Sequence, residues 1–346
     1  MIKCVIWDLD NTLLDGVFLE SPDQPPPANP RLAGLLHELG RRGILHAIAS
    51  KNPPEAGQYA ERATGHSFAA TRCDWGTKSA AIHAIMAELG LTADSVAFTD
   101  DDPMERALVS FSLPDVLVLA PEDMSAAAGW PQFSPAVVTD EARRRGELYR
   151  QRRVRQEEAR AFGGSRDEFL LHSRTRVAIG SATAADLPRL HELSVRTHQF
   201  NSAGMAISEA ELASLFASSA HQVLAVRLAD MFGDDGLVGG CVLATESSWQ
   251  VPLLMMSCRA LGRGVIDAFL TWICRAARQA GAAQVALPCV ISPRNVPLRI
   301  ALTGAGFRAD GVPGQDAAAD AEASRTAVYT KDLAEPLPEL PSWVVQ

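Results

Sequence analysis

The chain has 346 residues, which is too many for one compact core, so two domains are expected. Its composition, 47% hydrophobic and 21% charged, provides enough apolar surface to offset the chain entropy lost on folding. A net charge of −9 argues against non-specific nucleic-acid binding, and no uninterrupted apolar stretch is long enough to span a bilayer.

The six cysteines show neither a CxxC pair nor the spacing of a zinc site. Several lie within apolar runs, where a free cysteine packs as a small hydrophobic residue. Asp8 and Asp10 interrupt the first apolar run, so no secretory leader is indicated. A reduced, cytoplasmic protein is therefore expected, with cysteines at Cys4, Cys73, Cys241, Cys258, Cys274 and Cys289.

Strands and helices alternate along the first part of the chain. Short apolar runs rich in β-branched residues predict buried strands, and leucines three and four residues apart predict amphipathic helices. Such alternation predicts βαβ units and a parallel sheet. The predicted elements are a strand at 2–7, a proline-rich loop at 21–30, a helix at 31–42, a strand at 44–49, helices at 55–64 and 79–89, and strands at 95–99 and 116–120.

The character of the chain changes after residue 127. Pro131 and Pro135 interrupt the pattern, and an arginine-rich helix then continues to about residue 161. A second α/β unit begins near Thr175 and ends before a segment with three prolines. We predict a parallel-sheet domain at 1–127, a helical connector at 128–174, a second α/β domain at 175–335 and a proline-rich tail at 336–346.

The arginine-rich helix runs against the acidic balance of the chain. One interpretation is a solvated helix face, on which the arginines lie beside Glu147, Glu157 and Glu158. The other is a basic patch that faces an acidic partner protein. The arginines are Arg143, Arg144, Arg145, Arg150, Arg152, Arg153, Arg155 and Arg160.

Two carboxylates follow the first predicted strand directly, within the segment DLDNT at 8–12. In a doubly wound sheet, ligands collect beyond the carboxyl ends of the strands. Asp8 can attack phosphorus there, while Asp10 can donate and accept the leaving-group proton. Because carboxylate and phosphate repel each other, such a site needs a divalent cation and fixed donors.

The ends of later predicted strands supply these groups. Ser50 can donate its hydroxyl to a phosphoryl oxygen, and Lys78 can neutralise Asp8 and the phosphate. Acidic residues after the strand at 95–99 can complete a Mg²⁺ site with oxygen ligands. The alternative is that these carboxylates only cap helices. The predicted Mg²⁺ ligands are Asp8, Asp10, Asp100 and Asp101, with Asp102 as a further acid, and the candidate substrate-binding neighbours are Asn11, Thr12, Lys51 and Asn52.

The order DxDxT, serine, lysine and an acidic pair, each after a predicted strand, resembles the haloacid-dehalogenase phosphotransferase superfamily across its catalytic core. The resemblance implies a Rossmann-like domain that forms an aspartyl-phosphate at Asp8 with Mg²⁺. Both places where a large cap domain could insert are short in this chain. An open site is therefore implied, suited to a macromolecular substrate or to one delivered by a partner.

A second pattern, SCRALGRG at 257–264, lies where a predicted strand ends and a helix begins. A glycine-bearing turn before a helix N-terminus can hold phosphate groups through backbone N–H groups and the helix dipole. The spacing RxxGxG resembles the pyrophosphate loop of the GNAT acyltransferase fold, which holds the pantetheine arm. Arg259, Gly262 and Gly264 are therefore candidate binding residues.

Cys258 lies at the start of this turn. A helix N-terminus and the neighbouring Arg259 would favour its thiolate form, which is the nucleophilic one. The alternative is a strand cysteine that only packs. Cys4 is a competing candidate four residues before Asp8, although its position inside a buried strand indicates packing.

Both halves together resemble the FkbH-like family, in which a haloacid-dehalogenase-type domain is fused to a GNAT-like domain in polyketide pathways. The resemblance implies a bifunctional enzyme that takes the glyceryl unit of 1,3-bisphosphoglycerate, removes its phosphates and loads it as a thioester on an acyl carrier protein. Cys258 would carry the acyl group. The matching stretches are KCVIWDLDNTL (3–13), ASKN (49–52), WGTK (75–78), FTDDDPMER (98–106), RTHQFN (196–201) and SCRALGRG (257–264).

Other positions match the family less strongly. Gln199 and Asn201 match positions that could hydrogen-bond the acyl oxygen or the glyceryl hydroxyls, with helix capping as the alternative. Arg294 and Asn295 match a Lys/Arg-Asn pair. His198 replaces the asparagine usual in the family, so no essential role as a base is expected.

The segment after DxDxT departs from the LWGG of many relatives, because it reads LDGV at 14–17 and continues into a shorter, proline-rich loop. That resembles the branch that supplies alkoxymalonyl units, such as methoxymalonyl-carrier protein, more than the tetronate-forming branch.

Three functions remain open. The first is the bifunctional glyceryl transferase and phosphatase, and the second is a simple Mg²⁺-dependent phosphatase with the C-terminal unit as scaffold. The third is a coenzyme A-dependent acyltransferase or binding module with a degenerate Asp8 site, against which the intact motif set argues.

Overall fold

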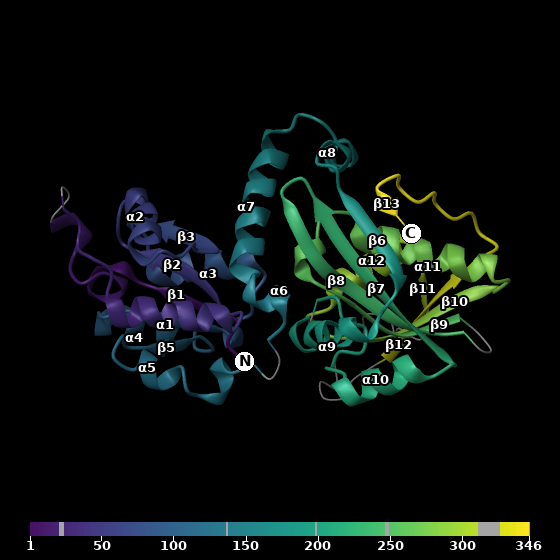
Figure 1. The fold of residues 1–346 in the computed structure, drawn as a ribbon, viewed down its shortest axis with the longest axis horizontal. Coiled ribbons are helices and arrows are strands. Elements are labelled where there is room, and N and C mark those ends of the chain that lie inside the picture. Colours follow the sequence, from purple (N-terminus) through teal and green to yellow (C-terminus); the bar gives the residue numbers. More distant parts are fainter. Residues whose placement is uncertain (21–23, 136–137, 198, 246–248, 311–325, 346) are drawn as a thin grey trace, which may run out of the picture. The chain divides into compact units, whose positions relative to one another are not determined.

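Two units, Met1–Val154 and Arg155–Gln346, each contain a sheet of their own in the computed structural model (Figure 1). The structure describes residues 1–20, 24–135, 138–197, 199–245, 249–310 and 326–345. The boundary between the units lies inside helix α7 (Arg145–Ala161), within the predicted connector. In this described part of the chain, no helix is both long enough and apolar enough to cross a membrane.

The first unit is built on five parallel strands in the order β3-β2-β1-β4-β5. The central strand β1 pairs with β2 and β4, so that Trp7 lies opposite both Ile48 and Thr99. The direction in which the chain adds strands reverses at β1, and doubly wound sheets bind ligands at such a point. The strands are β1 (Cys4–Trp7), β2 (Leu45–Ser50), β3 (Ala70–Cys73), β4 (Val96–Thr99) and β5 (Leu117–Leu119).

Helices cover both faces of this sheet, which is why its strands are nearly continuous apolar runs. Val5 and Trp7 pack with α1, α2 and α5, whereas Cys4 and Ile6 pack with α3 and α4 on the other face. The helices are α1 (Pro30–Arg41), α2 (Pro54–Thr64), α3 (Lys78–Leu89), α4 (Pro103–Ser112), α5 (Met124–Ala127) and α6 (Asp140–Arg143), with short turns η1 (Leu9–Leu13), η2 (Phe18–Glu20), η3 (Ala93–Ser95) and η4 (Pro131–Phe133).

The second unit contains a mixed sheet of eight strands in the order β11-β12-β10-β9-β8-β7-β6-β13. Neighbours are antiparallel except for two parallel pairs, β9 with β10 and β6 with β13. Residues of α11 and α12 pack in one core and those of α9 and α10 in another. The predicted α/β class, a parallel-sheet domain followed by a second α/β domain, is confirmed.

The strands of this unit are β6 (Arg176–Ser181), β7 (His221–Asp230), β8 (Gly233–Ala244), β9 (Trp249–Met256), β10 (Gln284–Val290), β11 (Arg308–Asp310), β12 (Thr326–Asp332) and β13 (Val344–Val345). Its helices and turns are α8 (Arg166–His172), η5 (Ala184–Asp186), α9 (Leu187–Arg196), α10 (Glu209–Ala217), η6 (Cys258–Ala260), α11 (Val265–Gln279) and α12 (Val296–Gly304).

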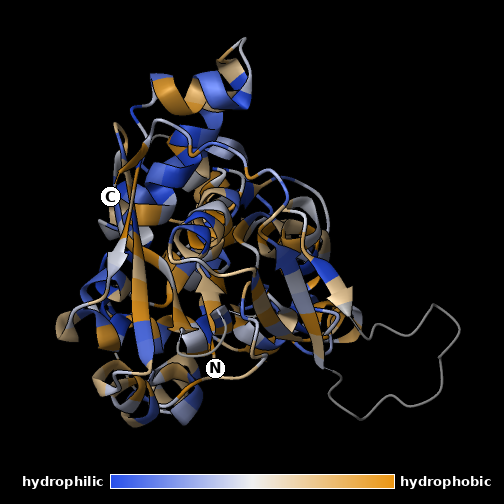
Figure 2. Ribbon diagram, turned by 90° about the vertical axis from the view of Figure 1, so that its right-hand side faces the viewer, coloured by the Kyte–Doolittle hydropathy of each residue, from blue (hydrophilic) through white to orange (hydrophobic). Residues whose placement is uncertain are grey.

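Some elements lie where the sequence predicted no regular structure. β3 carries Thr71 and Arg72 at its centre, so it lacks an apolar run, and α4 is mostly exposed. The segment predicted as a tail instead ends in β13, because the buried Trp343 accepts a 2.9 Å hydrogen bond from the N–H of Val177. Hydrophobic colour is concentrated on strands and on helix faces (Figure 2).

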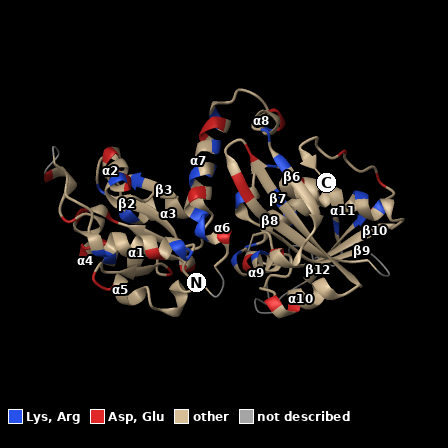
Figure 3. Ribbon diagram, in the orientation of Figure 1, with Lys and Arg blue, Asp and Glu red and all other residues tan. Residues whose placement is uncertain are grey.

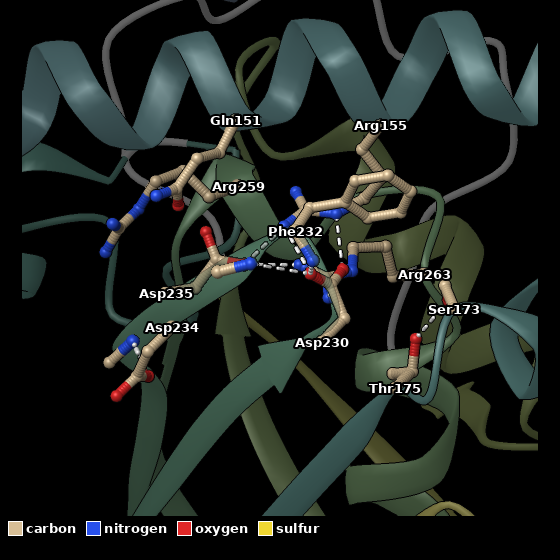
Figure 4. Close-up of polar contacts among 12 residues, drawn as sticks. Gln151, Arg155, Ser173, Thr175, Asp230, Phe232, Asp234, Asp235, Arg259 and Arg263 are labelled. Carbon is tan, nitrogen blue, oxygen red and sulfur yellow. Dashed lines mark hydrogen bonds and ion pairs between the residues drawn. The ribbon is translucent and has the colours of Figure 1, made fainter.

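Four charged side chains form a buried network in the second unit (Figure 4). Arg155 of α7 and Arg263 of the loop before α11 each contact both Asp230 and Asp235. Arg155 Nη2 lies 3.0 Å from Asp230 Oδ1, and Arg263 Nη2 lies 2.6 Å from Asp230 Oδ2. The side chains are 7% exposed or less, and two positive charges balance two negative ones. Burial and the charge of Arg155 lower the pKa of Arg263.

This network corrects both interpretations of the arginine-rich helix at Arg155, which is buried and can contact neither solvent nor a partner. Other arginines of the segment have local partners: Arg143 lies 3.0 Å from Asp140, and Arg150 pairs with Glu147. Basic and acidic residues alternate along α7 (Figure 3). For the rest of the segment, the structure therefore favours a charge-paired helix face.

Removing one arginine of the network should be costly, because it leaves two buried carboxylates with a single cation between them. We expect Arg155→Ala to lower the free energy of unfolding of the second unit by about 3–5 kcal/mol. Arg160→Ala, at an exposed position of the same helix, should change it by less than about 0.5 kcal/mol. Urea unfolding followed by near-ultraviolet circular dichroism measures both, and equal effects of the two substitutions would contradict this account.

Candidate active site

The turn after β1 carries the first candidate residue, Asp8. Its N–H donates to the carbonyl of Thr99 at 2.9 Å, which fixes the backbone against β4. The chain then enters the turn η1, in which Asn11 has a φ of +50°. Asparagine tolerates this left-handed conformation better than most residues, so the DxDxT sequence fits the sharp turn it must make.

Asp8 contacts two groups that come from other strand ends. The hydroxyl of Ser50, at the end of β2, donates to Asp8 Oδ1 at 2.8 Å, and Lys78 Nζ, from the start of α3, contacts the same oxygen. Lys78 Nζ also lies 3.0 Å from Asp100 Oδ2, just beyond β4. Asp8 and Lys78 are each 5% exposed, and Asp100 is 1% exposed. The predicted quartet of Asp8, Ser50, Lys78 and an acidic residue is therefore assembled in one place.

Burial and charge oppose each other in this cluster. Burial raises the pKa of Asp8 to about 6, although the Lys78 ammonium and the Ser50 hydroxyl act in the opposite direction. Burial alone would lower the pKa of Lys78, but the neighbouring carboxylates outweigh it and raise that pKa. Lys78 is therefore held as a cation beside two carboxylates, and further positive charge next to Asp8 would favour its ionised form.

Three carboxylates are arranged so that they could hold one metal ion. Asp8, Asp100 and Asp101 each offer an oxygen, and these oxygens lie within 4.8 Å of one another. An all-carboxylate set of this kind suits Mg²⁺, which prefers hard oxygen ligands. Burial and the charge of Asp100 raise the pKa of Asp101. A divalent cation beside Asp101 would favour its ionised form. The chemistry of this donor set therefore fits the predicted cofactor.

Asp10 lies outside this group of three. Its Oδ1 accepts a hydrogen bond from the Phe18 N–H at 2.9 Å, and its Oδ2 accepts one from Asn52 Nδ2, also at 2.9 Å. These two bonds fix the carboxylate in one orientation next to the site. Its predicted roles as a metal ligand and as a proton donor stay predictions.

The other predicted neighbours divide into buried and exposed groups. Asn52 Nδ2 also donates to Ser50 Oγ at 3.1 Å. Asn52 and Ser50 therefore link Asp10 to Asp8 through hydrogen bonds. Among the described residues, neither Asn52 Oδ1 nor Thr12 Oγ1 has a hydrogen-bond partner, although both side chains are fully buried. Asn11 hydrogen-bonds Asp101. Lys51 is exposed and lies 2.5 Å from Glu105.

Two features of the acidic loop were not recognised from the sequence. Arg106 donates to the carbonyls of Asp100 and Asp101, both at 2.7 Å, and so holds the loop. Asp102 accepts the Met104 N–H at 2.8 Å, so it caps α4. The sequence offered two roles for Asp102, a further acid at the Mg²⁺ site or a helix cap. The structure gives it the role of a helix cap. The sequence PMER after the aspartates was the available signal.

The second pattern also forms the predicted turn. Cys258 is half-buried and begins η6, directly after β9. Ser257 Oγ accepts the backbone N–H and the side-chain Nε of Arg259, both at 3.3 Å. Gly262 and Gly264 have φ values of +73° and +66°, which favour glycine, and Gly264 precedes α11.

Cys4 is fully buried in β1, where burial raises the pKa of its thiol far above the usual range. Such a thiol is inert. The packing role expected for Cys4 from the sequence is the one that its environment favours.

The segment around Asn201 lies between β9 and β10. Phe200 accepts the N–H of Met256 at 2.9 Å, and Ser202 donates to Leu254 at 3.0 Å and accepts the N–H of Val290 at 2.8 Å. The segment therefore connects the two strands beyond their short direct pairing.

Asn201 itself is 1% exposed, and its amide makes four hydrogen bonds to backbone atoms, one to Ser194 of α9 and three within its own loop. Gln199 is half-buried in the preceding turn, and His198 lies outside the described residues. Asn295 is fully buried and bonds to the backbone of Val290 and Ser292, whereas Arg294 is exposed. Both asparagines thus shape loops, and substrate binding by these residues stays a prediction.

No family model matches the chain, and no curated protein matches it. Among solved structures, the N-terminal part of the protein BF1531 from Bacteroides fragilis, which contains a phosphatase domain complexed with Mg, is 26% identical. That match covers 36% of this chain and 38% of the other, less than two thirds of its length, with a TM-score of 0.33.

Acetyltransferases are also similar in structure. The ribosomal-protein-S18-alanine N-acetyltransferase from Escherichia coli is 15% identical, over 44% of this chain and 90% of that one, with a TM-score of 0.34. The spermidine N-acetyltransferase from Vibrio cholerae, in complex with CoA and spermine, is 13% identical, over 46% and 96%, with a TM-score of 0.36. All three TM-scores are below 0.5.

Proposed function

We propose that the first unit is a Mg²⁺-dependent phosphatase of the haloacid-dehalogenase type, with Asp8 as nucleophile. The observation that carries this proposal is the buried cluster in which Lys78 contacts both Asp8 and Asp100, with Asp101 beside them. When bound by Asp8, Asp100 and Asp101, Mg²⁺ would stabilise the charge that develops on the phosphoryl oxygens.

The residues divide the reaction into two steps. Ser50 and Lys78 both contact Asp8 Oδ1, which leaves Oδ2 to attack phosphorus. As the bond from phosphorus to the ester oxygen breaks, Asp10 protonates the departing alcohol. Water then attacks the aspartyl-phosphate, Asp10 takes its proton, and Asp8 and inorganic phosphate are released.

We further propose that the chain is a bifunctional glyceryl transferase and phosphatase that supplies alkoxymalonyl extender units in polyketide biosynthesis. The Cys258 thiolate would attack the acyl carbon of 1,3-bisphosphoglycerate, and the acyl–oxygen bond would break to release inorganic phosphate. The phosphopantetheine thiol of an acyl carrier protein would then displace Cys258 as thiolate. The half-buried position of Cys258 before α11, beside Arg259, supports this role, and the inert environment of Cys4 removes its competitor.

A simple phosphatase with the second unit as scaffold is the alternative. The observation that favours it is the segment 200–202, which bonds to both β9 and β10, together with the loop bonds that occupy the amide of Asn201. Both features give this segment a structural role in the second unit.

Intact-mass measurement separates the two functions. The protein is mixed with Mg²⁺, enzymatically generated 1,3-bisphosphoglycerate and a phosphopantetheinylated carrier protein. We expect a glyceryl adduct on the enzyme, then on the carrier, and no adduct in Cys258→Ala; Cys241→Ala, at a fully buried cysteine of β8, is the matched control. No adduct on either protein, with phosphate still released in an Asp8-dependent way, would leave only the simple phosphatase.

One helix next to the site carries an exposed apolar stripe. Met104, Leu108 and Phe111, at i, i+4 and i+7 of α4, are 69%, 53% and 90% exposed. α4 follows the acidic loop of Asp100 and Asp101 directly. Such stripes commonly mark protein-binding surfaces. We propose that the carrier protein docks here when it presents a phosphorylated acyl group to Asp8.

Phe111→Ser tests this docking surface. It should lower kcat/KM roughly tenfold for a phosphoglyceryl group attached to the carrier, because aromatic anchors dominate interfaces. Hydrolysis of para-nitrophenyl phosphate should not change, since the Phe111 side chain is 90% exposed and is not among the groups that contact Asp8. Leu171→Ser, at an exposed position of α8, is the control. Equal loss with both substrates would show that the change acts on the site itself.

A further inference from the structure

A cavity of about 310 Å³ lies in the first unit, at the opposite end of the sheet from Asp8. His46, the second residue of β2, lines it, whereas Ser50, the last residue of that strand, contacts Asp8. The ends of α1 and α2 and the segment from α6 into α7 complete its wall. The volume is at the lower end of the range for small-molecule pockets. The proposed phosphatase chemistry uses none of these residues.

The imidazole of His46 forms part of the cavity wall. Trp7 Nε1 donates to His46 Nδ1 at 3.0 Å, so the imidazole proton must lie on Nε2. His46 is 2% exposed, and the backbone of Leu36 in α1 hydrogen-bonds the ring. The ring is therefore fixed between Trp7 and α1.

Two further histidines surround this ring. The ring of His66 lies 5.0 Å from that of His46 and 5.4 Å from that of His37, centroid to centroid. Burial and the neighbouring imidazoles lower the pKa of His66 to about 4 and lower that of His46 as well. At neutral pH both rings are therefore uncharged, and each neutral imidazole keeps one N–H group.

Cations form the rim of the cavity. Arg41, Arg143 and Arg150 line it, and Glu147 is the one carboxylate among the lining residues that are described. Arg150 donates to Ser67 Oγ at 3.1 Å and pairs with Glu147, which orients its guanidinium. Arginine and imidazole N–H groups together favour oxyanions such as phosphate and carboxylate.

A metal ion fits this cavity less well. In the described part of the chain, the one group of three metal-binding side chains with ligand atoms within 4.8 Å is Asp8, Asp100 and Asp101. The three imidazoles are therefore not arranged around a common centre. His46 Nδ1 accepts from Trp7, and His37 Nε2 is 2.8 Å from the carbonyl of Thr64, so a nitrogen of each ring is already engaged.

We propose that this cavity is a second ligand site, separate from the phosphatase centre, that binds a small molecule with a phosphate or carboxylate group. The imidazoles of His46 and His66 line its floor, and Arg41, Arg143 and Arg150 balance the charge of the oxyanion at the rim. The ligand is held at the amino end of β2, the strand that carries Ser50 to Asp8 at its other end.

Side-chain nuclear magnetic resonance tests this directly, because no histidine lies among the described groups that contact Asp8. The full chain, labelled with nitrogen-15, is titrated with inorganic phosphate and, separately, with citrate at constant ionic strength. We expect the imidazole signals of His46 and His66 to shift and saturate with at least one of the two anions. Which anion binds more tightly separates a phosphate ligand from a carboxylate ligand.

Two substitutions should remove this response without unfolding the protein. Arg150→Gln removes a rim cation, and Gly146→Leu fills the cavity from a helical position where an added Cβ meets no atom within 4 Å. Each should raise the dissociation constant at least tenfold, whereas Arg62→Gln, at an exposed arginine of α2 that does not line the cavity, should not. An unchanged unfolding midpoint confirms that each variant is folded.

Three results would overturn the proposal. The signals of His46 and His66 could stay in place up to about 10 mM of either anion, a range that would reveal even millimolar affinity. They could shift equally in Arg150→Gln, Gly146→Leu and the unsubstituted chain. They could respond to Zn²⁺ but to neither anion, which would assign the cavity to a metal instead. None of these outcomes depends on whether Asp8 hydrolyses phosphate esters.

Discussion

The first unit depends on one buried interaction, the contact of the Lys78 ammonium with both Asp8 and Asp100. Without that cation, two buried carboxylates would repel each other and lose their hydration, and at least one would be protonated. With it, an anionic nucleophile can be held beneath the carboxyl ends of β1 and β4. The sheet positions Asp8, Ser50 and Asp100, because Asp8 and Asp100 follow β1 and β4 and Ser50 ends β2, and these strands pair in register. Lys78 then reaches the centre from the first residue of α3, which Thr77 caps through the N–H of Ala80.

The sequence predicts this part of the molecule well because its chemistry is local to strand ends. A buried strand is a short apolar run, and the residue after it lies at the ligand-binding edge, so Asp8, Ser50 and Asp100 could be grouped from spacing alone. Arg106 could not, because an arginine that holds a loop through backbone carbonyls leaves no periodic pattern. β3 was not predicted for a similar reason, since Thr71 and Arg72 interrupt its apolar character. The capping role of Asp102 does have a signal, the proline that follows it at the start of α4.

The second unit is harder to predict because its organisation depends on contacts distant in sequence. The arginine-rich helix has the composition of a solvated face, yet Arg155 is buried against Asp230 and Asp235, which lie 75 and 80 residues away. The proline-rich end of the chain has the composition of a tail, yet Trp343 brings it back to β6. Asn201 and Asn295 match a family pattern, but their amides bond to their own loops. Polar residues that build a loop and those that bind a substrate have the same composition, and only their hydrogen bonds distinguish them.

Chemical trapping at Asp8 tests the central claim of a covalent phosphatase most directly. The protein is mixed with Mg²⁺ and para-nitrophenyl phosphate, quenched rapidly, reduced with borohydride and mapped by peptide mass spectrometry. An aspartyl-phosphate is an acyl phosphate and is reduced to homoserine, whereas a free carboxylate is not. The account predicts homoserine in place of Asp8 when Mg²⁺ and ester are both present, and not when either is omitted. An unmodified Asp8, together with phosphate release that persists in Asp8→Asn, would contradict it.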